Sequence, residues 1–471
     1  MHSYFPTYIS NKAIAVYVAG LVTVTLLFFN RSMAMLWFLF GILEVVGFFY
    51  FSSQLTRNWQ KYTSRIFAKK IFITALVIRV VYVFFSYLFF LYMTDAPFEF
   101  SAADAAGYDG EGTWLADMLK EGWGFGPYFE YIDGRYSDMG YPLYLGLQYY
   151  ITDNSIIVAR LLKALYGAYL CVLVYRLATR NFGESTGKMA AIFCMLMPNL
   201  IYYCGLHLKE AEMVFLTVWY VERADALLRS KSYKFLNILP VLLLALSLFF
   251  FRTALGATAL IAFFTAVVFS ESRLVGWQKK VSLGVWLLAC MFYMGGTKIS
   301  NEVNSLVQNY ETNQSTSMEW RAERKGGNSF AKYAKTSIFA PLIFTIPFPT
   351  MVETEGQENQ RMIHGGNYVK NVTSFFTLLA LWILFVRRKV WRKHVLLIAI
   401  LCGYLAVIAM SSFAHSERFH LPALPFALIM AAYGISEMKQ RDRIYYHIWL
   451  AFIFVAMVGW NWFKLAGRGL D

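Results

Sequence analysis

Long apolar segments recur from one end of the chain to the other, separated by polar turns. Many are about 20 residues long, which is the length that a helix needs to cross the hydrocarbon core of a bilayer. The alternating pattern of a membrane β-barrel does not occur, and in hydrocarbon a helix satisfies its own backbone polar groups. We therefore predict an all-α polytopic membrane protein with about 13 transmembrane helices. They are expected at residues 13–29, 33–53, 71–94, 156–178, 187–205, 210–228, 235–251, 254–270, 281–297, 371–387, 394–411, 418–436 and 444–462.

The polar turns divide the chain by charge. Lysines and arginines gather in four of them, at residues 57–70, 176–188, 387–393 and 439–443. All four lie on one side of the membrane if the first segment runs outward, and the positive-inside rule makes that side the cytoplasm. Membrane topology thus explains the net charge of +14, and we expect no nucleic acid partner. With 58% hydrophobic and only 15% charged residues, the composition also excludes a soluble protein.

Two long loops are expected on the opposite, extracytoplasmic side, at residues 95–155 and 298–370. The second loop contains the apolar segment "IFAPLIFTIPFPTMV" at 338–352, which prolines interrupt and which is too short to span. We predict that it is re-entrant or interfacial.

The first loop is strongly acidic. Between Asp95 and Asp138 there are ten acidic residues, opposed only by Lys120 and Arg135. The apolar positions at 114, 115, 118 and 119 have helical spacing, which predicts a short amphipathic helix on the membrane surface. Before this helix, Asp104 and Tyr108 lie in a stretch that the glycines at 107, 110 and 112 should allow to bend sharply. A partly desolvated carboxylate there could act as a general base, although a solvated acidic loop is the simpler interpretation.

Three other polar clusters are expected at the same membrane boundary. The first is the turn with His207, Lys209, Glu210 and Glu212, where ionisable groups are costly and usually functional. The second is Arg252, whose apolar flanks imply an anionic partner unless the side chain snorkels to the interface. The third is the helix start "SSFAHSERFHLPALP", where Arg418 and His420 could bind phosphate. A carboxylate near several cations suits a reaction with a lipid phosphate leaving group and a hydroxyl acceptor. These clusters comprise His207, Lys209, Glu210, Glu212, Arg252, His415, Glu417, Arg418 and His420.

The order of several short motifs resembles that of GT-C integral membrane glycosyltransferases, in the branch with protein O-mannosyltransferases and lipid A aminoarabinose transferase. The motifs are "DAAGY" (104–108), "WLADML" (114–119), "MGYPLYLGLQYYI" (139–151), "PNLIYYCGLHLKEAE" (198–212) and "RFHLPALP" (418–425). The resemblance implies a GT-C fold with extracytoplasmic interfacial helices. Its core would be 71–297, preceded by two additional transmembrane helices and a basic cytoplasmic loop at 1–70. The loop 298–370 and C-terminal transmembrane helices at 371–471 would follow.

The resemblance also implies roles for individual residues and a cellular location. Asp104 would activate the acceptor and Glu210 would be a second catalytic acid. Arg418, Lys209, Arg252 and His420 would bind the donor phosphate, and Tyr108, Asp109, Glu212 and His207 would bind substrate. Ala105 follows Asp104 where the family often has an adjacent acid, which argues against a metal bridged by two carboxylates. A divalent metal is still a possible cofactor, with unknown ligands. We expect a protein of the bacterial inner membrane whose active site faces the periplasm.

Three hypotheses of function remain open at this point. The first is an inverting glycosyltransferase that moves a sugar from a polyprenyl-phosphate donor to a lipid, glycan or protein acceptor. The second is a lipid-linked polysaccharide polymerase or O-antigen-type ligase, which would depend on Arg321, Arg324 and Arg361 in the second loop. The third is a lipid-linked sugar transporter or flippase, which would need charges such as Arg79 and Arg160 on broken helices in the membrane.

Overall fold

The computed structural model describes residues 2–470 except 134–136, 138, 231–233, 270–309, 324–326, 334–335 and 412. The fold is all-helical, and no strand occurs among the described residues. Its helices are α1 (Thr7–Leu27), α2 (Met35–Asn58), α3 (Ser64–Thr94), α4 (Ala103–Lys120), α5 (Gly126–Ile132), α6 (Gly140–Thr152), α7 (Ile156–Phe182), α8 (Glu184–Leu196), α9 (Pro198–Tyr202), α10 (Glu210–Arg229), α11 (Phe235–Phe251), α12 (Thr253–Phe269), α14 (Tyr310–Glu323), α15 (Thr336–Leu342), α16 (Glu358–Met362), α17 (His364–Trp382), α18 (Val395–Met410), α19 (Glu417–His420), α20 (Leu424–Glu437) and α21 (Arg443–Ala466), with short 3-10 or π turns between some of them.

Long apolar helices confirm that the chain is a polytopic membrane protein. Eight described helices are long and apolar enough to cross a bilayer, and the bent pair α8–α9 makes a ninth if it is one span. The helices α11 and α12 are apolar but shorter, and α10 carries more charge. The predicted span 281–297 lies outside the described residues. The total of 13 spans therefore stays a prediction.

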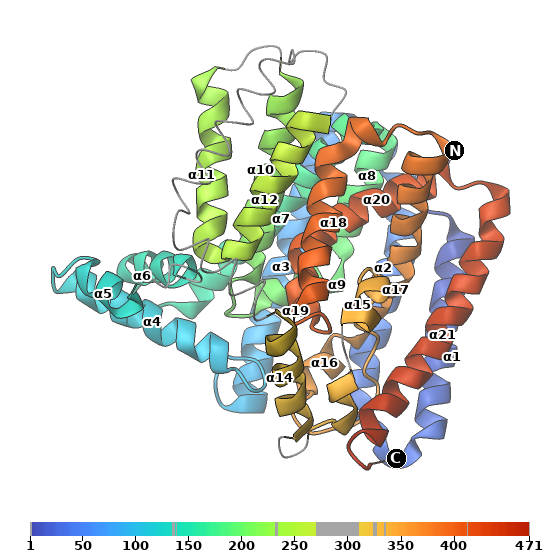
Figure 1. The fold of residues 1–471 in the computed structure, drawn as a ribbon, viewed down its shortest axis with the longest axis horizontal. Coiled ribbons are helices and arrows are strands. Elements are labelled where there is room, and N and C mark those ends of the chain that lie inside the picture. The colour runs from blue at the N-terminus through green and yellow to red at the C-terminus, as the bar shows by residue number, and fades with distance from the viewer. Residues whose placement is uncertain are drawn as a thin grey trace.

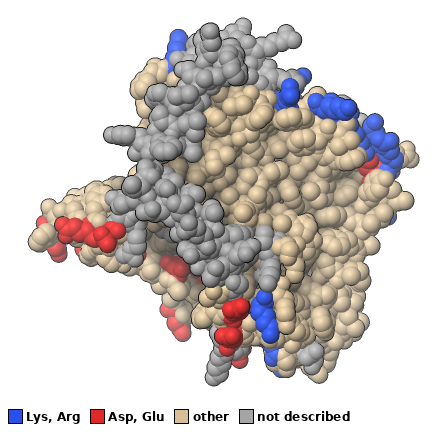
Figure 2. Space-filling view, viewed as in Figure 1, with Lys and Arg blue, Asp and Glu red and all other residues tan. Residues whose placement is uncertain are grey.

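The four basic turns meet at one end of the helical bundle, which we call the basic end. Lys188 donates to the carbonyls of Gln60 and Tyr62, which joins the turns at 57–70 and 176–188. The ring of His394 bonds to Asn181, and Arg388 and Arg387 pair with Glu437 and Asp442 in turn. The N-terminus lies at this end, at the upper right of Figure 1, and the acidic helices α4 to α6 project away from the bundle at the lower left. Figure 2 shows lysine and arginine along one edge and acidic residues over these helices.

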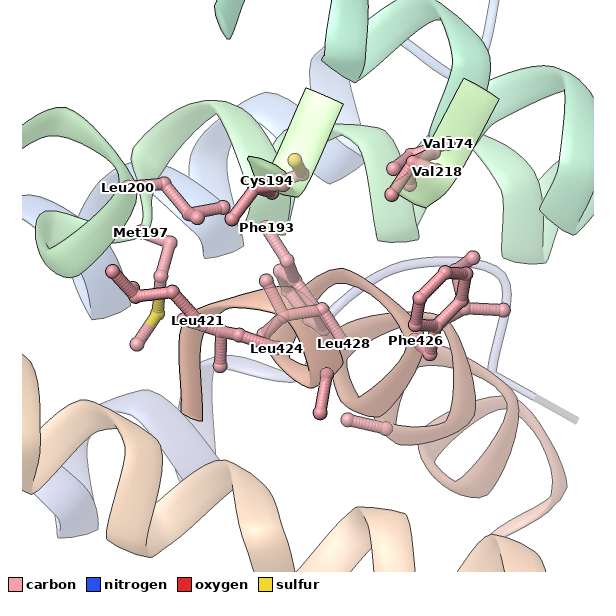
Figure 3. Close-up of a cluster of buried hydrophobic side chains, with 14 of the residues drawn as sticks. Val174, Phe193, Cys194, Met197, Leu200, Val218, Leu421, Leu424, Phe426 and Leu428 are labelled. Atoms are coloured by element: carbon pink, nitrogen blue, oxygen red, sulfur yellow. The ribbon is translucent and has the colours of Figure 1, made fainter. Parts of the chain in front are cut away.

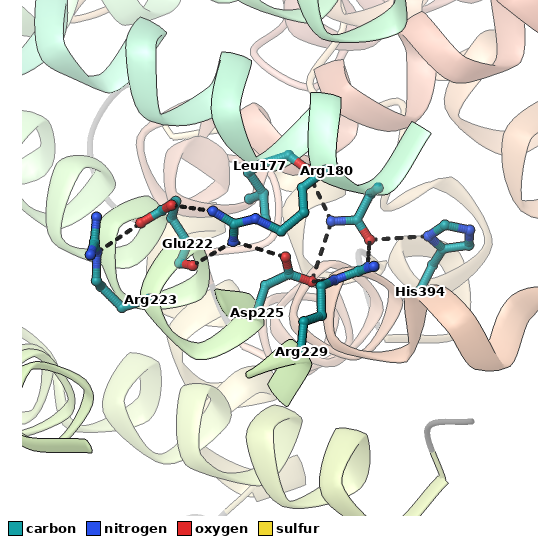
Figure 4. A network of polar contacts seen from close by, with 8 residues as sticks. Leu177, Arg180, Glu222, Arg223, Asp225, Arg229 and His394 are labelled. Carbon is teal, nitrogen blue, oxygen red and sulfur yellow. Dashed lines mark hydrogen bonds and ion pairs between the residues drawn. The ribbon is translucent and has the colours of Figure 1, made fainter. Parts of the chain in front are cut away.

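Acidic residues at the basic end are paired inside the protein. Arg180 bonds to Glu222 at 2.6 Å and to Asp225 at 3.0 Å, and Arg229 reaches Asp225 from the next turn of α10 (Figure 4). This network links α7 to α10 and continues through Asn181 to His394. The charged residues of α10 thus hold this helix against α7 through ion pairs. These pairs explain why α10 is less apolar than the neighbouring helices.

The core between these ends is made by close packing of α7, α8, α10 and α20. Val174, Phe193, Val218 and Leu428 are buried there and lie close together (Figure 3). Gly434 of α20 packs against the backbone of α17, because a Cβ at this position would lie 2.1 Å from the Phe376 carbonyl oxygen. Small residues permit such close helix packing in membranes, where lipid tails are as apolar as the helices.

The break between α8 and α9 has a specific cause. Pro198 lacks a backbone N–H, so it cannot donate to the carbonyl of Cys194 one turn earlier. The helix bends by 54° at this point. The guanidinium of Arg79, which is fully buried on α3, donates to the freed carbonyl of Cys194 at 3.2 Å and to that of Met195 at 3.4 Å. Arg79 therefore replaces hydrogen bonds that the break removes.

The apolar segment of the second loop packs inside the helical bundle, and its re-entrant or interfacial place in the membrane stays a prediction. After α15 the chain is mostly non-helical as far as α16, and it lies between α17 and α21. Buried amides satisfy its backbone: Asn371 donates to the carbonyl of Pro347, and Asn461 accepts from the N–H of Met351 at 2.6 Å. Asn371 lies seven residues into α17, so the segment reaches roughly 10 Å past the start of this helix. Irregular backbone at this depth requires such internal partners.

The first loop forms α4 to α6, and α4 differs from the prediction. A sharp bend at Gly107, Gly110 and Gly112 was expected, but all three glycines lie within α4, which begins at Ala103. The reason is close packing of α4 against α6. A Cβ on Gly112 would lie 2.9 Å from the Leu145 Cβ, and one on Gly146 would lie 2.6 Å from the Leu115 Cβ. Gly112 and Gly146 thus let the middle of α4 touch α6.

Candidate active site at the start of α4, α10 and α19

Arg418 binds both Asp104 and Glu210. The sequence places these three residues in three separate clusters. Its Nη1 donates to the Oδ2 of Asp104 at 2.5 Å, and its Nε donates to the Oε1 of Glu210. The acids are 314 and 208 positions away in the chain. The fold thus brings the predicted base, the second acid and the predicted phosphate-binding arginine into direct contact.

Each of these residues lies at the start of a helix. Asp104 is in the first turn of α4, Glu210 is the first residue of α10, and Arg418 is the second residue of α19. The N-terminal end of a helix carries partial positive charge, which stabilises both carboxylates. Arg418 is disfavoured by the same effect at its own helix start, so its pairing with two acids offsets that cost.

The two acids differ strongly in solvent access. The side chain of Asp104 is 58% exposed, that of Arg418 18%, and that of Glu210 0%. Glu210 therefore holds Arg418 from inside the protein, while Asp104 faces the open side of the cluster. Of the two, only Asp104 can meet an acceptor that arrives from solvent or from the membrane surface.

A buried cation, Lys163, fixes the turn before α10. Its Nζ donates to the hydroxyl of Tyr141 at 2.7 Å and to the carbonyls of Leu206 at 3.0 Å and Leu208 at 2.5 Å. Glu212 lies 3.8 Å away and supplies the counter-charge. Lys163 comes from α7, so it ties α6, α7 and α10 together next to the site. An intramembrane lysine is costly unless it is bonded in this way.

Tyr108 and Lys209 form a second contact between the acidic loop and the turn before α10. The Nζ of Lys209 lies 5.8 Å from the centroid of the Tyr108 ring, and this ring meets Tyr141 edge to face at 5.0 Å. Tyr108 is one helical turn after Asp104, and Lys209 directly precedes Glu210. The predicted substrate-binding tyrosine and the predicted phosphate-binding lysine therefore lie beside the acid–arginine cluster.

His207 and Asp109 are connected through Tyr149. The Tyr149 hydroxyl donates to the Oδ1 of Asp109 at 2.5 Å and lies 3.1 Å from the Nε2 of His207. Because the Tyr149 hydroxyl donates its hydrogen bond to Asp109, it can only accept one from His207. This arrangement requires the tautomer of His207 that carries its proton on Nε2. Burial, with the charges of Lys163 and Arg160 nearby, holds the pKa of His207 well below its ordinary value. The imidazole is therefore neutral at physiological pH.

The remaining predicted phosphate ligands, Arg252 and His420, have different surroundings. The guanidinium carbon of Arg252 lies 4.5 Å from the centroid of the Phe419 ring, and that of Arg418 lies 5.9 Å from the same centroid. Arg252 is thus a second cation at the edge of the site. His420 is buried, with Nδ1 2.9 Å from the Nζ of Lys370 and Nε2 2.7 Å from the Ala414 carbonyl. These two contacts engage both ring nitrogens of His420 within the protein.

Sequence reasoning missed Lys163, Tyr141 and Tyr149, which organise the site. Lys163 could have been found as a lone lysine in an apolar helix, a position where a charge needs partners. The tyrosines carry no such signal, because the chain contains 31 of them. Their importance follows only from the packing of α6 against α4 and α7.

The arginines of the other hypotheses have different surroundings. Arg361 is buried and donates to the carbonyl of Thr354 and to Glu358 within its own loop. Arg324 and the side chain of Arg321 lie outside the described residues. Arg160 is buried in α7 and donates to the carbonyl of Pro97, where the first loop begins.

Among the described residues, no group of three or more histidine, cysteine, aspartate or glutamate side chains could hold a metal ion. No family model matches the chain, and no curated protein matches it. The interpretation of the site therefore depends on the contacts between its own residues.

Proposed function

We propose that this protein is an inverting glycosyltransferase of the GT-C type. It moves a sugar from a polyprenyl-phosphate donor to a hydroxyl group of a lipid, glycan or protein acceptor. The observation that carries the proposal is the contact of Arg418 with an exposed acid, Asp104, and a buried acid, Glu210. A base and a phosphate-binding cation are the two groups that this reaction needs side by side.

The proposed reaction is a single displacement at the anomeric carbon of the sugar. Asp104 takes the proton of the acceptor hydroxyl as its oxygen attacks this carbon from the face opposite the phosphate. The bond from the carbon to the phosphate oxygen breaks, and polyprenyl phosphate leaves with the electron pair. Attack from the opposite face inverts the anomeric configuration.

Arg418 has a second task in this reaction, because the phosphate gains negative charge as it leaves. The guanidinium has five N–H donors, and the bonds to Glu210 and Asp104 use one each. Its remaining donors can bind phosphate oxygens, and Arg252, which contacts the same Phe419 ring, is a second cation. When phosphate binds, Arg418 can loosen its bond to Asp104, which frees the carboxylate for the acceptor.

We further propose that the site faces the periplasm from the inner membrane of a bacterium, with about 13 spans in total. The meeting of the four basic turns at the basic end supports this orientation, because such turns collect in the cytoplasm. The acidic helices α4 to α6 belong to the other side (Figure 2). A lipid-linked donor of the outer leaflet would then reach the site directly.

One observation favours transport instead, namely the bent span α8–α9 with Arg79 at its break. Transporters often place charges on broken helices at the centre of the membrane. Arg79 is fully buried and bonded to backbone carbonyls, so its surroundings give it a structural task. Asp104 beside Arg418 is 58% exposed and can be reached by a substrate, which supports an enzyme over a transporter.

The experiment is transfer by purified protein in lipid nanodiscs, with lipid-linked sugars and acceptors extracted from the source membranes. We expect Asp104→Asn to reduce transfer by at least about a hundredfold, the usual effect of losing a general base. The matched control is Asp117→Asn, which changes an exposed acid on the same helix and should leave transfer unchanged. Full activity of Asp104→Asn would overturn the proposal.

A further inference from the structure

A separate cavity of about 310 Å³ lies between the second loop and the C-terminal end of α21. Lys464, Arg468 and His415 lie along its wall together with the amides of Gln357 and Gln360. None of the described residues that line it is acidic. The cavity therefore combines a positive charge with neutral hydrogen-bonding groups, and the proposed transfer site does not use it.

Lys464 is the most unusual residue of this cavity. It is buried, with 6% of its surface exposed, and the acid whose charge acts on it, Glu417, does not line the cavity. Its Nζ donates to the Oε1 of Gln360 at 3.1 Å and lies 4.9 Å from the centroid of the Trp460 ring. Arg468 donates to the Lys464 carbonyl at 2.7 Å, which brings a second cation next to the first. Two neighbouring cations that face amides and an aromatic ring suit an anionic ligand.

The neutral part of the lining indicates what carries this anion. Trp460 and Phe463, whose rings stack with their centroids 5.6 Å apart, add an apolar surface, and the amides of Gln357 and Gln360 add donors and acceptors. Sugar rings have apolar faces and a rim of hydroxyl groups, so they can use both kinds of surface. A bare phosphate ion would use only the cations.

We propose that this cavity binds a sugar that carries an anionic group, and that this sugar is part of the acceptor. The second half of the proposal rests on the proposed transferase function. Lys464 and Arg468 bind the anionic group, while Trp460 and Gln360 contact the ring and its hydroxyls. A negative charge on the acceptor would thus select it before its hydroxyl group meets the base.

Helix α16 connects the cavity to the transfer site. Gln360 on this helix faces Lys464, while its neighbour Asn359 donates to the carbonyl of Phe100 at 2.6 Å, just before α4 begins. Asn359 also accepts from the hydroxyl of Tyr202 at 3.5 Å. One short helix therefore contacts both the cavity and the segment that leads to Asp104. An acceptor longer than one sugar can extend past this helix toward the base.

The test is equilibrium binding of glucose 6-phosphate, glucose and inorganic phosphate to the full-length protein in neutral lipid nanodiscs. Glucose 6-phosphate should bind at least about tenfold more tightly than either of the others, because only it uses both the cations and the neutral lining. Lys464→Gln should weaken binding of glucose 6-phosphate by about tenfold or more and leave glucose within about twofold. The matched control, Lys439→Gln, changes an exposed lysine at the basic end and should have no effect.

A second variant keeps the test valid if Lys464→Gln does not fold. Gln360→Glu retains Lys464 and gives it an ionic partner, so we expect it to fold and to bind glucose 6-phosphate at least about tenfold more weakly. Equal binding of glucose 6-phosphate and glucose, or equal binding of inorganic phosphate, would overturn the proposed ligand class. So would unchanged binding in both variants.

Transfer assays separate this inference from the proposed function. When the acceptor concentration is varied up to saturation, Gln360→Glu should raise the KM for the acceptor and leave kcat unchanged. Asp104→Asn should retain binding of glucose 6-phosphate while it loses transfer. Predicted binding without any transfer by the wild-type protein would contradict the transferase proposal and keep the anionic-sugar site. Transfer without the predicted binding would overturn the inference alone.

Discussion

Arg418 holds a buried carboxylate and an exposed one at the same time. Glu210 has no solvent access and its Oε2 has no hydrogen bond among the described residues, so its charge depends on the arginine. Breaking a buried ion pair by removing one partner leaves an uncompensated charge, which costs more than the pair contributes. Asp104 is solvated and can lose the same partner at little cost.

This difference in burial predicts that removing the charge of Glu210, but not that of Asp104, restores the stability lost when Arg418 is replaced. Arg418→Met should lower the free energy of unfolding by about 3–5 kcal/mol, because the charge of Glu210 loses its partner. Adding Glu210→Gln should restore most of that loss, whereas adding Asp104→Asn should restore little. Denaturant unfolding of the three variants in one detergent measures both effects. Equal rescue by the two second substitutions would show that burial of Glu210 is not what makes Arg418 important.

His207 predicts a loss of stability in acid. Its pKa in the folded protein lies well below the ordinary value of 6.5, so below that pH the unfolded chain binds a proton more readily than the folded one. The contribution of neutral His207 to the free energy of unfolding is complete above about pH 6.5 and is lost as the pH falls below that value. We expect the Tm to fall between pH 7.5 and pH 5, and to fall less in His207→Gln, which cannot be protonated. An identical pH dependence of both proteins would exclude this residue as the cause.

The helices α4 and α6 set the position of the candidate base through their contact. Gly112 and Gly146 lie where the two helices touch, and an added Cβ on either meets an opposing side chain at 2.9 Å or less. Gly110 on α4 has no atom within 4 Å of its added Cβ. Adding a side chain should therefore disturb packing at Gly112 and Gly146 but not at Gly110.

A pair of glycine substitutions tests this contact. Gly146→Ala should push α6 from α4, cost about 1–3 kcal/mol in stability and reduce transfer, because Asp104 moves with its helix. Gly110→Ala should leave transfer intact and raise stability by up to about 1 kcal/mol, because alanine favours a helix more than glycine does. Thermal unfolding and transfer rate are measured for both. Loss of transfer in Gly110→Ala, or no loss in Gly146→Ala, would contradict the account.

The sequence predicted helices better than it predicted contacts between them. Apolar runs and basic turns located most spans, since both signals lie within a short stretch of chain. The α4 helix was predicted to begin after its glycines, because local glycine propensity favours a bend and the packing partner Leu145 lies in another helix. Asp104, Glu210 and Arg418 could each be selected from local sequence, but no local signal joins Arg418 to both acids. That contact requires α4, α10 and α19 to meet, and only tertiary structure determines this.

The whole molecule separates its charges along the bundle. Basic turns and paired acids occupy one end, and the transfer site and the anionic-sugar cavity belong to the side with the two long loops. Arg79 and Lys163 lie deep in the helices but are bonded to backbone carbonyls. The candidate site and the cavity around Lys464 thus lie away from the basic end, on the side that we propose to be the extracytoplasmic membrane boundary. A reaction between a lipid-linked donor and a polar acceptor fits that boundary, because both substrates can reach it.

The most direct measurement is a cryo-EM structure of Asp104→Asn in nanodiscs with extracted donor lipid. The account predicts that the variant retains the donor uncleaved, with its phosphate within hydrogen-bond distance of the guanidinium of Arg418. The anomeric carbon should lie between that phosphate and the side chain at position 104. Donor density at the basic end, or a phosphate with no contact to Arg418, would contradict the account.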